Sequence, residues 1–264
     1  MTFCQRFNIG NKKIKCKGGI KVRLCCHFEA ETVPLPYQMM FVSLIKEILK
    51  SSSEEYFNQL YYYDHDKRNK QSKNFCFSVF LKNFELKNEH FILKEGLNLN
   101  ISSPDKLFLV NFFNGLLKTK SFNYKNYFIK LVKVYPLPEK NITEERVTFK
   151  TMSPIYLTDK RKKPLSPYDE NFTKEYNYLS DKILANYRGE GLSRTIEFTP
   201  IQMKKIVVKE KINEFQRNTG KEYMFLESYE GTFSLQGDVS DLRDIYALGV
   251  SLRRSQGFGM IEVI

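Results

Sequence analysis

The residues best suited to chemistry lie near the C-terminus, where three glycines surround two adjacent arginines. Gly249, Gly257 and Gly259 flank Arg253 and Arg254. Glycine has no side chain to keep a ligand away from backbone N–H groups, and arginine offers a planar fork that matches a phosphate. The stretch is therefore a candidate phosphate-binding loop. A glycine turn beside a solvated arginine pair explains the same residues equally well.

Histidine chemistry is limited to three side chains, His27, His65 and His90. Histidine has an ordinary pKa of about 6.5, so it can act as a general acid or base near neutral pH. His65 lies in a polar stretch between Asp64 and Asp66, which can raise its pKa or orient its ring. The residues alone are explained better by an exposed loop histidine without a catalytic task. His27 falls on the polar face of an expected strand and His90 in an expected hairpin, so neither position favours catalysis.

The composition favours a polyanionic partner. The formal net charge is +12, and nucleic acid is the leading class of ligand. Hydrophobic residues make up 42% and charged residues 27% of the 264, as in a folded globular chain. No long apolar run or signal-like segment occurs, so we expect a cytoplasmic protein that does not enter a membrane. The five cysteines show no metal-ligand spacing, which favours reduced thiols, with neither a metal site nor a cofactor.

The hydrophobic pattern predicts two α+β halves. The first half has the order strand, helix, strand, strand, helix, strand, which is that of a ferredoxin-like domain and is shared by RNA-recognition domains. The expected strands of this half are residues 20–28, 75–81, 91–93, 97–101 and 127–134. The expected helices are residues 40–49, a short one that begins after residues 51–52, and one that begins at residues 103–105.

The second half repeats the same plan with additions. Its expected strands are residues 147–152, 201–209, 223–227, 232–236 and 258–263, with a turn at residues 218–220 and helices at residues 166–187 and 240–248. The sequence therefore predicts an antiparallel sheet with helices on one face in each of two tandem ferredoxin-like (RRM-like) domains. Their boundaries are a basic N-terminal extension at residues 1–18, a first domain at 19–134, a linker at 135–140, and a second domain at 141–264 that contains the glycine-rich loop 249–259.

Three segments resemble the CRISPR repeat-processing endoribonucleases of the RAMP superfamily, and they occur in the order found in that family. Residues 147–155 end in Ser-Pro-Ile, residues 230–238 contain Gly-Thr-Phe-Ser-Leu-Gln-Gly, and residues 249–263 match the glycine-rich loop and the hydrophobic strand after it. Leu35-Pro36-Tyr37 gives a looser match before the first helix. One departure is Ser251, which occupies the place of the loop's usual second glycine.

The resemblance implies an endoribonuclease that cleaves CRISPR repeat RNA to crRNA without a metal. In that reaction a 2′-hydroxyl attacks the adjacent phosphate and leaves a 2′,3′-cyclic phosphate and a 5′-hydroxyl. The resemblance assigns catalysis to His65, and to Lys73 the stabilisation of charge in the transition state. Lys46 stands where some members carry a catalytic tyrosine on the first helix. In a hydroxyl-assisted reaction, Tyr37 or one of residues 61–63 would have to replace that tyrosine.

The expected RNA contacts are the glycine-rich loop and two basic clusters. They are Gly249, Ser251, Arg253, Arg254, Gly257 and Gly259 of the loop, the run Lys160, Arg161, Lys162 and Lys163, and the pair Lys204 and Lys205. A lysine- and arginine-rich run is more often only a solvated loop. Recognition of an RNA hairpin and recognition of an unstructured repeat both remain open.

The main alternative is a non-catalytic RAMP subunit that binds guide RNA within a CRISPR effector complex. A nucleotide-binding enzyme is disfavoured, because the glycine stretch precedes a strand whereas dinucleotide and P-loop motifs open a helix. A general RNA-recognition protein is disfavoured because its aromatic strand motif is missing. The expected partner is repeat RNA or crRNA, and the sequence leaves open a Cascade-like effector complex and a homodimer.

Overall fold

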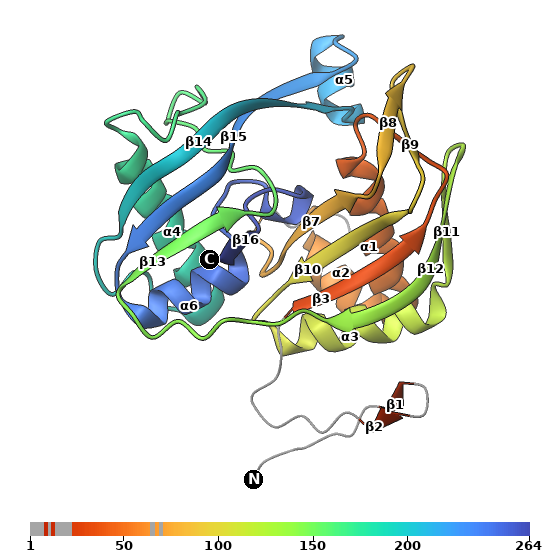
Figure 1. Cartoon of the computed structure of the whole chain (residues 1–264), viewed down its shortest axis with the longest axis horizontal. Coiled ribbons are helices and arrows are strands. Elements are labelled where there is room, and N and C mark those ends of the chain that lie inside the picture. Colours follow the sequence, from red (N-terminus) through yellow and green to blue (C-terminus); the bar gives the residue numbers. More distant parts are fainter. Residues whose placement is uncertain (1–7, 10–11, 14–22, 64–66, 69–70) are drawn as a thin grey trace.

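The computed structural model of the 264-residue chain describes residues 8–9, 12–13, 23–63, 67–68 and 71–264. In the described part, two α/β halves lie side by side (Figure 1). We call residues 23–136 the first half and residues 146–264 the second half. The two short strands β1 (Asn8–Ile9) and β2 (Lys12–Lys13) pair with each other. The rest of the predicted extension 1–18 lies outside the described residues.

The first half is built on a five-stranded antiparallel sheet in the order β11-β12-β3-β10-β7. Leu24, Cys26 and Phe28 alternate along β3 and join the core, and the helices supply Phe41 and Phe112 to the same core. The elements are β3 (Arg23–Glu29), α1 (Gln38–Ser52), α2 (Glu54–Tyr61), β7 (Cys76–Leu81), β10 (Leu97–Ser102), α3 (Lys106–Lys118), β11 (Ser121–Tyr124) and β12 (Tyr127–Pro136).

Two smaller sheets are added to the first half. The strands β4 (Thr32–Pro34), β9 (His90–Leu93) and β8 (Phe84–Lys87) form one, and β5 (Tyr62–Tyr63) pairs with β6 (Lys67–Arg68) in the other. The predicted strand at residues 91–93 therefore exists, but it belongs to an accessory sheet and not to the main one.

The second half is a four-stranded antiparallel sheet in the order β14-β15-β13-β16. Its core is separate from that of the first half and includes Phe149, Phe198, Phe233 and Leu242. The elements are β13 (Arg146–Thr151), α4 (Phe172–Arg188), β14 (Glu197–Glu210), α5 (Asn213–Thr219), β15 (Met224–Gln236), α6 (Val239–Leu248), the 3₁₀ helix η1 (Arg254–Gln256) and β16 (Ile261–Val263).

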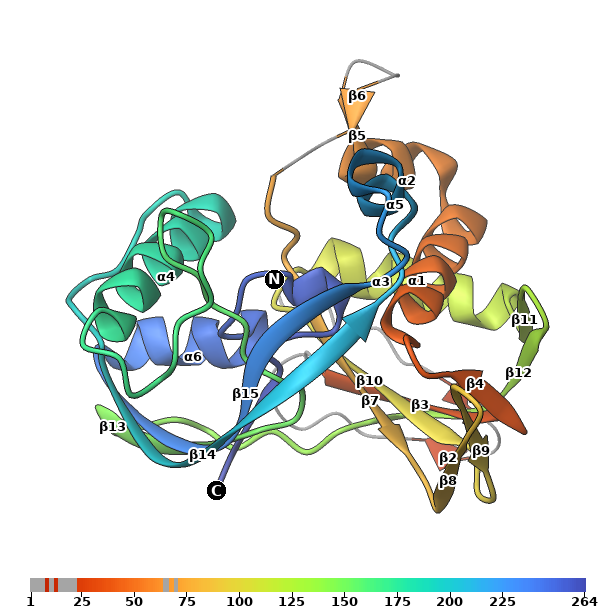
Figure 2. The same cartoon turned by 90° about the horizontal axis from the view of Figure 1, so that it is seen from above.

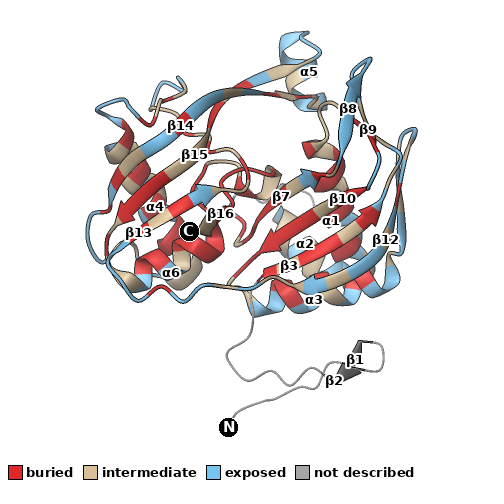
Figure 3. Cartoon of the chain, viewed as in Figure 1, coloured by how far each residue is buried: buried red, intermediate tan, exposed pale blue. Residues whose placement is uncertain are grey.

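Both halves place their strands in the same order. When the four strands of the repeated unit are numbered along the chain, each sheet reads 4-1-3-2, and a helix follows the first strand and the third. Figure 2 shows the helices of both halves on the same side of their sheets, and Figure 3 shows buried residues along the strands and on the helix faces toward them. The predicted pair of ferredoxin-like domains is confirmed.

Several details of the second half differ from the prediction, and both α4 and β16 begin later than expected, at Phe172 and Ile261. Residues 223–227 and 232–236 were expected as separate strands, but β15 runs unbroken because β14 pairs with it from Met224 to Gln236. Gly231 permits this continuity, since a Cβ at that position would lie 1.9 Å from the carbonyl oxygen of Gln202. The expected turn at residues 218–220 is instead the last part of α5 and Gly220, its left-handed C-cap.

A membrane-spanning helix is not found in the described residues, where every helix is too short or too polar to cross a bilayer.

A fully buried arginine joins the two halves. Arg23 on β3 has no exposed surface, and its Nη2 donates to the carbonyl oxygens of Tyr246 at 2.8 Å and Ile261 at 2.6 Å. Its Nη1 forms an ion pair with Glu262 at 2.9 Å. The guanidinium lies 3.7 Å from the centroid of the Tyr246 ring, and the Tyr246 hydroxyl donates to the other oxygen of Glu262 at 2.6 Å. One side chain of the first half thereby binds α6 and β16 of the second.

Replacing Arg23 with methionine is expected to lower the free energy of unfolding by about 3–5 kcal/mol, because it leaves Glu262 and two buried carbonyls without their donor. Urea denaturation followed by circular dichroism measures this change. The control is Arg146→Met, which removes an exposed arginine that pairs with Glu197 and is expected to have little effect. A value for Arg23→Met as small as that of the control would contradict the role of Arg23.

Candidate active site and RNA-binding surface

Two of the three predicted catalytic residues meet at one tyrosine ring. Lys46 comes from α1, and Lys73 from the segment before β7. Their Nζ atoms lie 4.9 Å and 5.6 Å from the ring centroid of Tyr61, the last residue of α2. The third, His65, lies outside the described residues, as do Asp64 and Asp66. Tyr61 directly precedes β5, and the His65 segment runs from β5 to β6, so the cluster stands at the start of that loop.

Lys73 has the electrostatics of a functional lysine. Its side chain is buried, and its Nζ donates to the carbonyl oxygen of Gln71 at 3.2 Å. Burial, together with the positive charge of Lys46, lowers the pKa of Lys73 to about 8. The ammonium can therefore give up a proton near neutral pH far more readily than an ordinary lysine. Burial raises the pKa of Tyr61, so its hydroxyl keeps its proton.

The segment that carries Lys73 is fixed by residues of the second half. Arg254 donates from Nη2 to the hydroxyl of Ser72 at 2.5 Å and from Nη1 to the carbonyl oxygen of Leu248 at 2.6 Å. Asn186 on α4 donates to the carbonyl oxygen of Ser72 at 3.0 Å. The glycine-rich loop and α4 together therefore position the backbone next to Lys73.

Arg254 does not have the role that the sequence suggested. Its side chain is 4% exposed, both terminal nitrogens are bonded within the protein, and burial lowers its pKa to about 10. A guanidinium enclosed in this way does not reach a phosphate in solvent. The structure gives Arg254 a different role from the predicted RNA contact, because its guanidinium links the two halves through Leu248 and Ser72.

The backbone N–H groups of the loop are also used inside the protein. Val250 donates to the carbonyl oxygen of Gly259 at 2.8 Å, Gly259 to Pro154 at 2.8 Å, and Gly249 to Ile245 at 2.8 Å. Gly257 donates to Arg254 at 3.3 Å. These bonds close the loop on itself and on the segment after β13. The N–H groups of Gly249, Gly257 and Gly259 are therefore bonded within the protein, and phosphate binding by this loop stays a prediction.

The glycines are required for a different reason, which is close approach to the first half. A Cβ at Gly257 would lie 3.0 Å from the Phe77 ring, and one at Gly249 would lie 3.0 Å from the Cys76 sulfur. Both glycines also have positive φ angles, +88° and +87°. The loop therefore packs directly on β7, the edge strand of the first sheet.

Ser251, which replaces the usual second glycine, is likewise structural. It is 1% exposed, and its hydroxyl donates to the carbonyl oxygen of Tyr156 at 3.0 Å and accepts from the Tyr156 N–H at 2.8 Å. The Ser251 hydroxyl is therefore bonded within the protein, and an RNA contact by Ser251 stays a prediction. The serine ties the loop to the segment after β13.

Arg253 keeps part of its surface accessible. Its side chain is 28% exposed and donates from Nη1 to Glu210 at 3.2 Å and to Gln256 at 2.8 Å. Glu210 is fully buried, and burial raises its pKa to about 7, although the charge of Arg253 opposes this shift. Arg253 therefore serves first as a counterion, and its exposed portion remains a candidate RNA contact.

The two predicted basic clusters lie on the surface. The side chain of Asp159 accepts from the N–H groups of Arg161 and Lys163, both at 2.8 Å, and this turn exposes all four cations from Lys160 to Lys163. Lys204 and Lys205 on β14 are exposed as well, and they pair with Glu230 at 3.0 Å and Glu227 at 2.6 Å. Both clusters are accessible to a phosphate backbone.

Comparison with known proteins identifies the second half. Residues 137–263 match the family model for CRISPR associated protein Cas6, C-terminal. The second half of the chain is therefore similar to the C-terminal domain of Cas6 proteins. The resemblance inferred from the sequence is thereby confirmed.

The similarity to Cas6 proteins extends over most of the chain. A relative from Methanocaldococcus jannaschii, CRISPR-associated endoribonuclease Cas6 1, is 27% identical over 246 residues, which cover 87% of this chain and 86% of the relative. The structure of a Cas6-related protein from Pyrococcus furiosus is 18% identical with a TM-score of 0.76, covering 92% of this chain and 98% of that one. A structure described as an RAMP protein binding different RNA substrates is 17% identical with a TM-score of 0.75, over 92% and 99% of the two chains. Both structures share the fold of this protein.

The buried Glu210 is expected to make stability depend on pH. Its pKa of about 7 in the folded protein lies above the ordinary 4.5, so the folded state holds the proton more tightly than the unfolded state. Between these values, the free energy of unfolding therefore falls as the pH rises. From pH 5 to pH 8 the free energy of unfolding of the wild type is expected to fall by about 2 kcal/mol more than that of Glu210→Gln.

Urea denaturation at several pH values measures this difference. The control is Glu144→Gln, which removes an exposed carboxylate and is expected to follow the wild type. Parallel pH dependences for the wild type and Glu210→Gln would contradict the raised pKa of Glu210.

Proposed function

We propose that this protein is a Cas6-type endoribonuclease that binds CRISPR repeat RNA and cuts it to crRNA without a metal ion. The proposal rests on the position of Lys46 and Lys73. The ammonium groups of both lie near the Tyr61 ring, at the start of the loop that contains His65. The domain match and the endoribonuclease name of the M. jannaschii relative support the substrate class.

The reaction assigned to this cluster is an internal transfer at phosphorus. His65 accepts the proton of the 2′-hydroxyl, and the 2′-oxygen attacks the adjacent phosphorus. The bond from phosphorus to the 5′-oxygen breaks, a proton passes to that oxygen, and the products carry a 2′,3′-cyclic phosphate and a 5′-hydroxyl. The ammonium groups of Lys73 and Lys46 stabilise the negative charge that develops on the phosphate oxygens.

RNA binding is assigned to surfaces of the second half. The exposed run from Lys160 to Lys163, the pair Lys204 and Lys205, and the accessible part of Arg253 supply positive charge to phosphates. The buried glycine-rich loop contributes indirectly, since Arg254 fixes the Ser72 backbone beside Lys73.

Replacing His65 with alanine is expected to reduce cleavage of the repeat RNA by roughly 10²–10⁴-fold, because the general base is lost, while RNA binding stays near wild type. The assay uses excess EDTA and identifies the product ends chemically. The control is His90→Ala, which changes an exposed histidine near Tyr127. Undiminished cleavage by His65→Ala would exclude His65 from the mechanism, and loss of wild-type cleavage in EDTA would exclude the metal-independent reaction. Binding without any cleavage would instead favour a non-catalytic RAMP subunit.

Lys73 is expected to set the alkaline limb of the pH–rate profile. Its ammonium is protonated below a pKa of about 8, so cleavage should decline as the pH rises through that value. Lys73→Arg keeps the positive charge at all these pH values and should move the decline to higher pH, whereas Lys73→Ala should lose roughly 10²-fold or more in rate. Single-turnover rates from pH 6 to pH 10 measure this. The control Lys106→Ala alters an exposed lysine and should keep the wild-type profile, and an unchanged limb in Lys73→Arg would contradict the assignment.

A further inference from the structure

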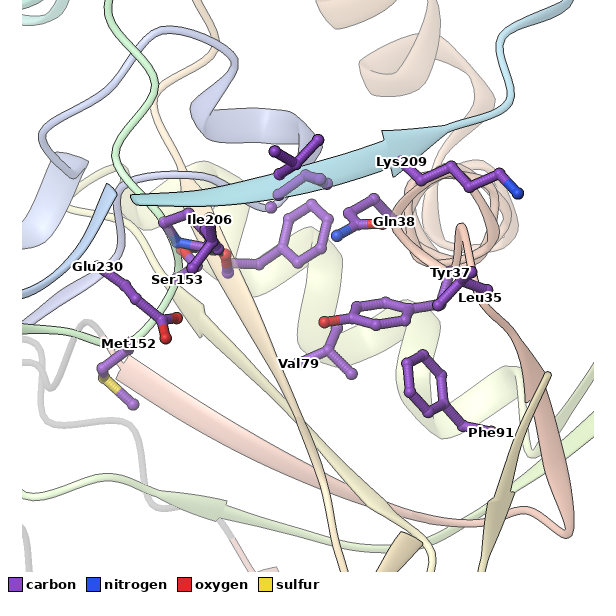
Figure 4. Close-up of a pocket in the computed structure, with 15 residues that line it drawn as sticks. Leu35, Tyr37, Gln38, Val79, Phe91, Met152, Ser153, Ile206, Lys209 and Glu230 are labelled. Carbon is purple, nitrogen blue, oxygen red and sulfur yellow. Dashed lines mark hydrogen bonds between the residues drawn. The ribbon is translucent and has the colours of Figure 1, made fainter. Parts of the chain in front are cut away.

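A pocket of about 360 Å³ lies between the two halves, and the proposed cleavage reaction does not use it. Its walls come from Tyr37 and Gln38 at the start of α1, from β7 of the first sheet and from β14 of the second (Figure 4). The volume is within the range of sites that bind small organic molecules, which begins at about 300 Å³.

Gln38 is the residue that points to a ligand. Its side chain is 8% exposed, and its amide oxygen Oε1 is buried without a hydrogen-bond partner among the described residues. Buried polar atoms are almost always bonded, so an orphaned amide oxygen beside a cavity indicates a donor that is supplied from outside the chain. The carboxamide also has two N–H donors, which allows it to bind a partner that presents both a donor and an acceptor.

Two further polar groups reach the same space. Figure 4 shows the Tyr37 hydroxyl directed toward the middle of the pocket and the Glu230 carboxylate entering from the opposite side. Burial, together with the negative charge of Glu230, raises the pKa of Tyr37 to about 12, so the hydroxyl stays protonated at neutral pH. Glu230 is held by Lys204 at 3.0 Å. These polar groups therefore reach the pocket from different sides.

Most of the remaining lining residues are apolar. The Tyr37 ring packs edge-on against Phe91, with centroids 6.0 Å apart at 62°. Val79 and Ile206 line other sides. The β14 wall is fixed by an ion pair from Lys209 to Glu89 of the first half, and the Tyr223 hydroxyl donates to the same carboxylate at 3.3 Å. The Lys209 ammonium points away from the pocket (Figure 4), so the interior holds no cation for a phosphate.

A flat ring with donors and acceptors on its edge fits these features, whereas an apolar side chain leaves the Gln38 oxygen unbonded and a phosphate lacks a counterion. We propose that this pocket binds a single nucleobase, whose edge hydrogen-bonds to the Gln38 amide while its faces contact the apolar walls. The inference rests on the proposed function, since an unpaired nucleotide of the bound RNA is one source of the base. A free nucleotide is the other molecule that can supply such a base.

The test uses Gln38→Leu, which keeps the side-chain volume and removes the amide. Leucine replaces an unbonded polar group in an apolar wall, so the melting temperature is expected to stay unchanged or rise by about 2–4 °C. A purely structural glutamine would give the opposite result, a lower melting temperature. The matched control is Gln202→Leu on the exposed surface of β14, which should keep wild-type behaviour.

RNA binding is then measured by fluorescence anisotropy with repeat RNAs that carry one abasic site at each unpaired position in turn. At one of these positions, removal of the base is expected to weaken RNA binding by the wild type about 10–100-fold, as for the loss of a stacked base. At that position, replacing the base with a different one is expected to lower the RNA affinity of the wild type about tenfold. The same replacement is expected to lower the affinity of Gln38→Leu less than twofold. In parallel, the four nucleoside monophosphates are titrated against both proteins and the melting temperature is followed.

The outcomes separate the pocket from the proposed function. An RNA position whose base preference depends on Gln38 supports the pocket with RNA as the source. A nucleotide that raises the melting temperature of the wild type but not of Gln38→Leu supports it with a free nucleotide as the source. The absence of both results overturns the proposal, even if the protein cleaves unmodified repeat RNA normally. Conversely, failure to bind or cleave unmodified RNA rejects the proposed function, while the nucleotide titration still decides the pocket.

Discussion

The burial of the Arg23 guanidinium is the constraint on which the rest of the structure depends. Removing a cation from water is costly, and this cost is offset here by two backbone carbonyls, the Glu262 carboxylate and the face of the Tyr246 ring. These groups must all be in place together, so the contact admits one relative placement of the two sheets. With that placement fixed, the glycine-rich loop can lie on β7 without steric conflict, and Arg254 can reach across to Ser72. The halves therefore act as one body around the candidate active site, although each has its own core.

The glycine-rich loop has a different role from the one its composition suggests. The N–H groups of its three glycines bond to carbonyls of the protein, the Ser251 hydroxyl bonds to Tyr156, and Arg254 is buried. The glycines permit contact with Phe77 and Cys76 at distances that a side chain would prevent. In the proposed reaction this loop holds the Lys73 segment in position, and exposed lysines elsewhere supply the positive charge for RNA. Preorganisation of this kind is what a reaction without large motions requires.

The sequence predicted the two halves well because each one buries its own set of side chains at strand and helix periods. It predicted the loop's location and its resemblance to Cas6 proteins correctly, but not the hydrogen bonds that the loop makes within the protein. A run of glycines and arginines looks the same whether its N–H groups face a ligand or a carbonyl, and only the neighbour distinguishes them. For the same reason the burial of Arg254 and the meeting of Lys46, Tyr61 and Lys73 could not be deduced, since they depend on contacts between distant segments. The sequence held one indication of the contact between the halves, because Arg23 lies on the polar face of a strand that the hydrophobic pattern predicts clearly.

The sequence separation between Arg23 and its partners also determines when the two halves can dock during synthesis. Tyr246 and Glu262 follow Arg23 by 223 and 239 residues, so their contact closes a very long loop. As the chain leaves the ribosome, the first half can acquire its own core long before those partners emerge. During that interval the guanidinium is hydrated and β7 has an uncovered edge. The final docking step then dehydrates the arginine and covers the edge together. Assembly of the site near Lys73 is thus a late event in biosynthesis, separated in time from the folding of the domain that contains it.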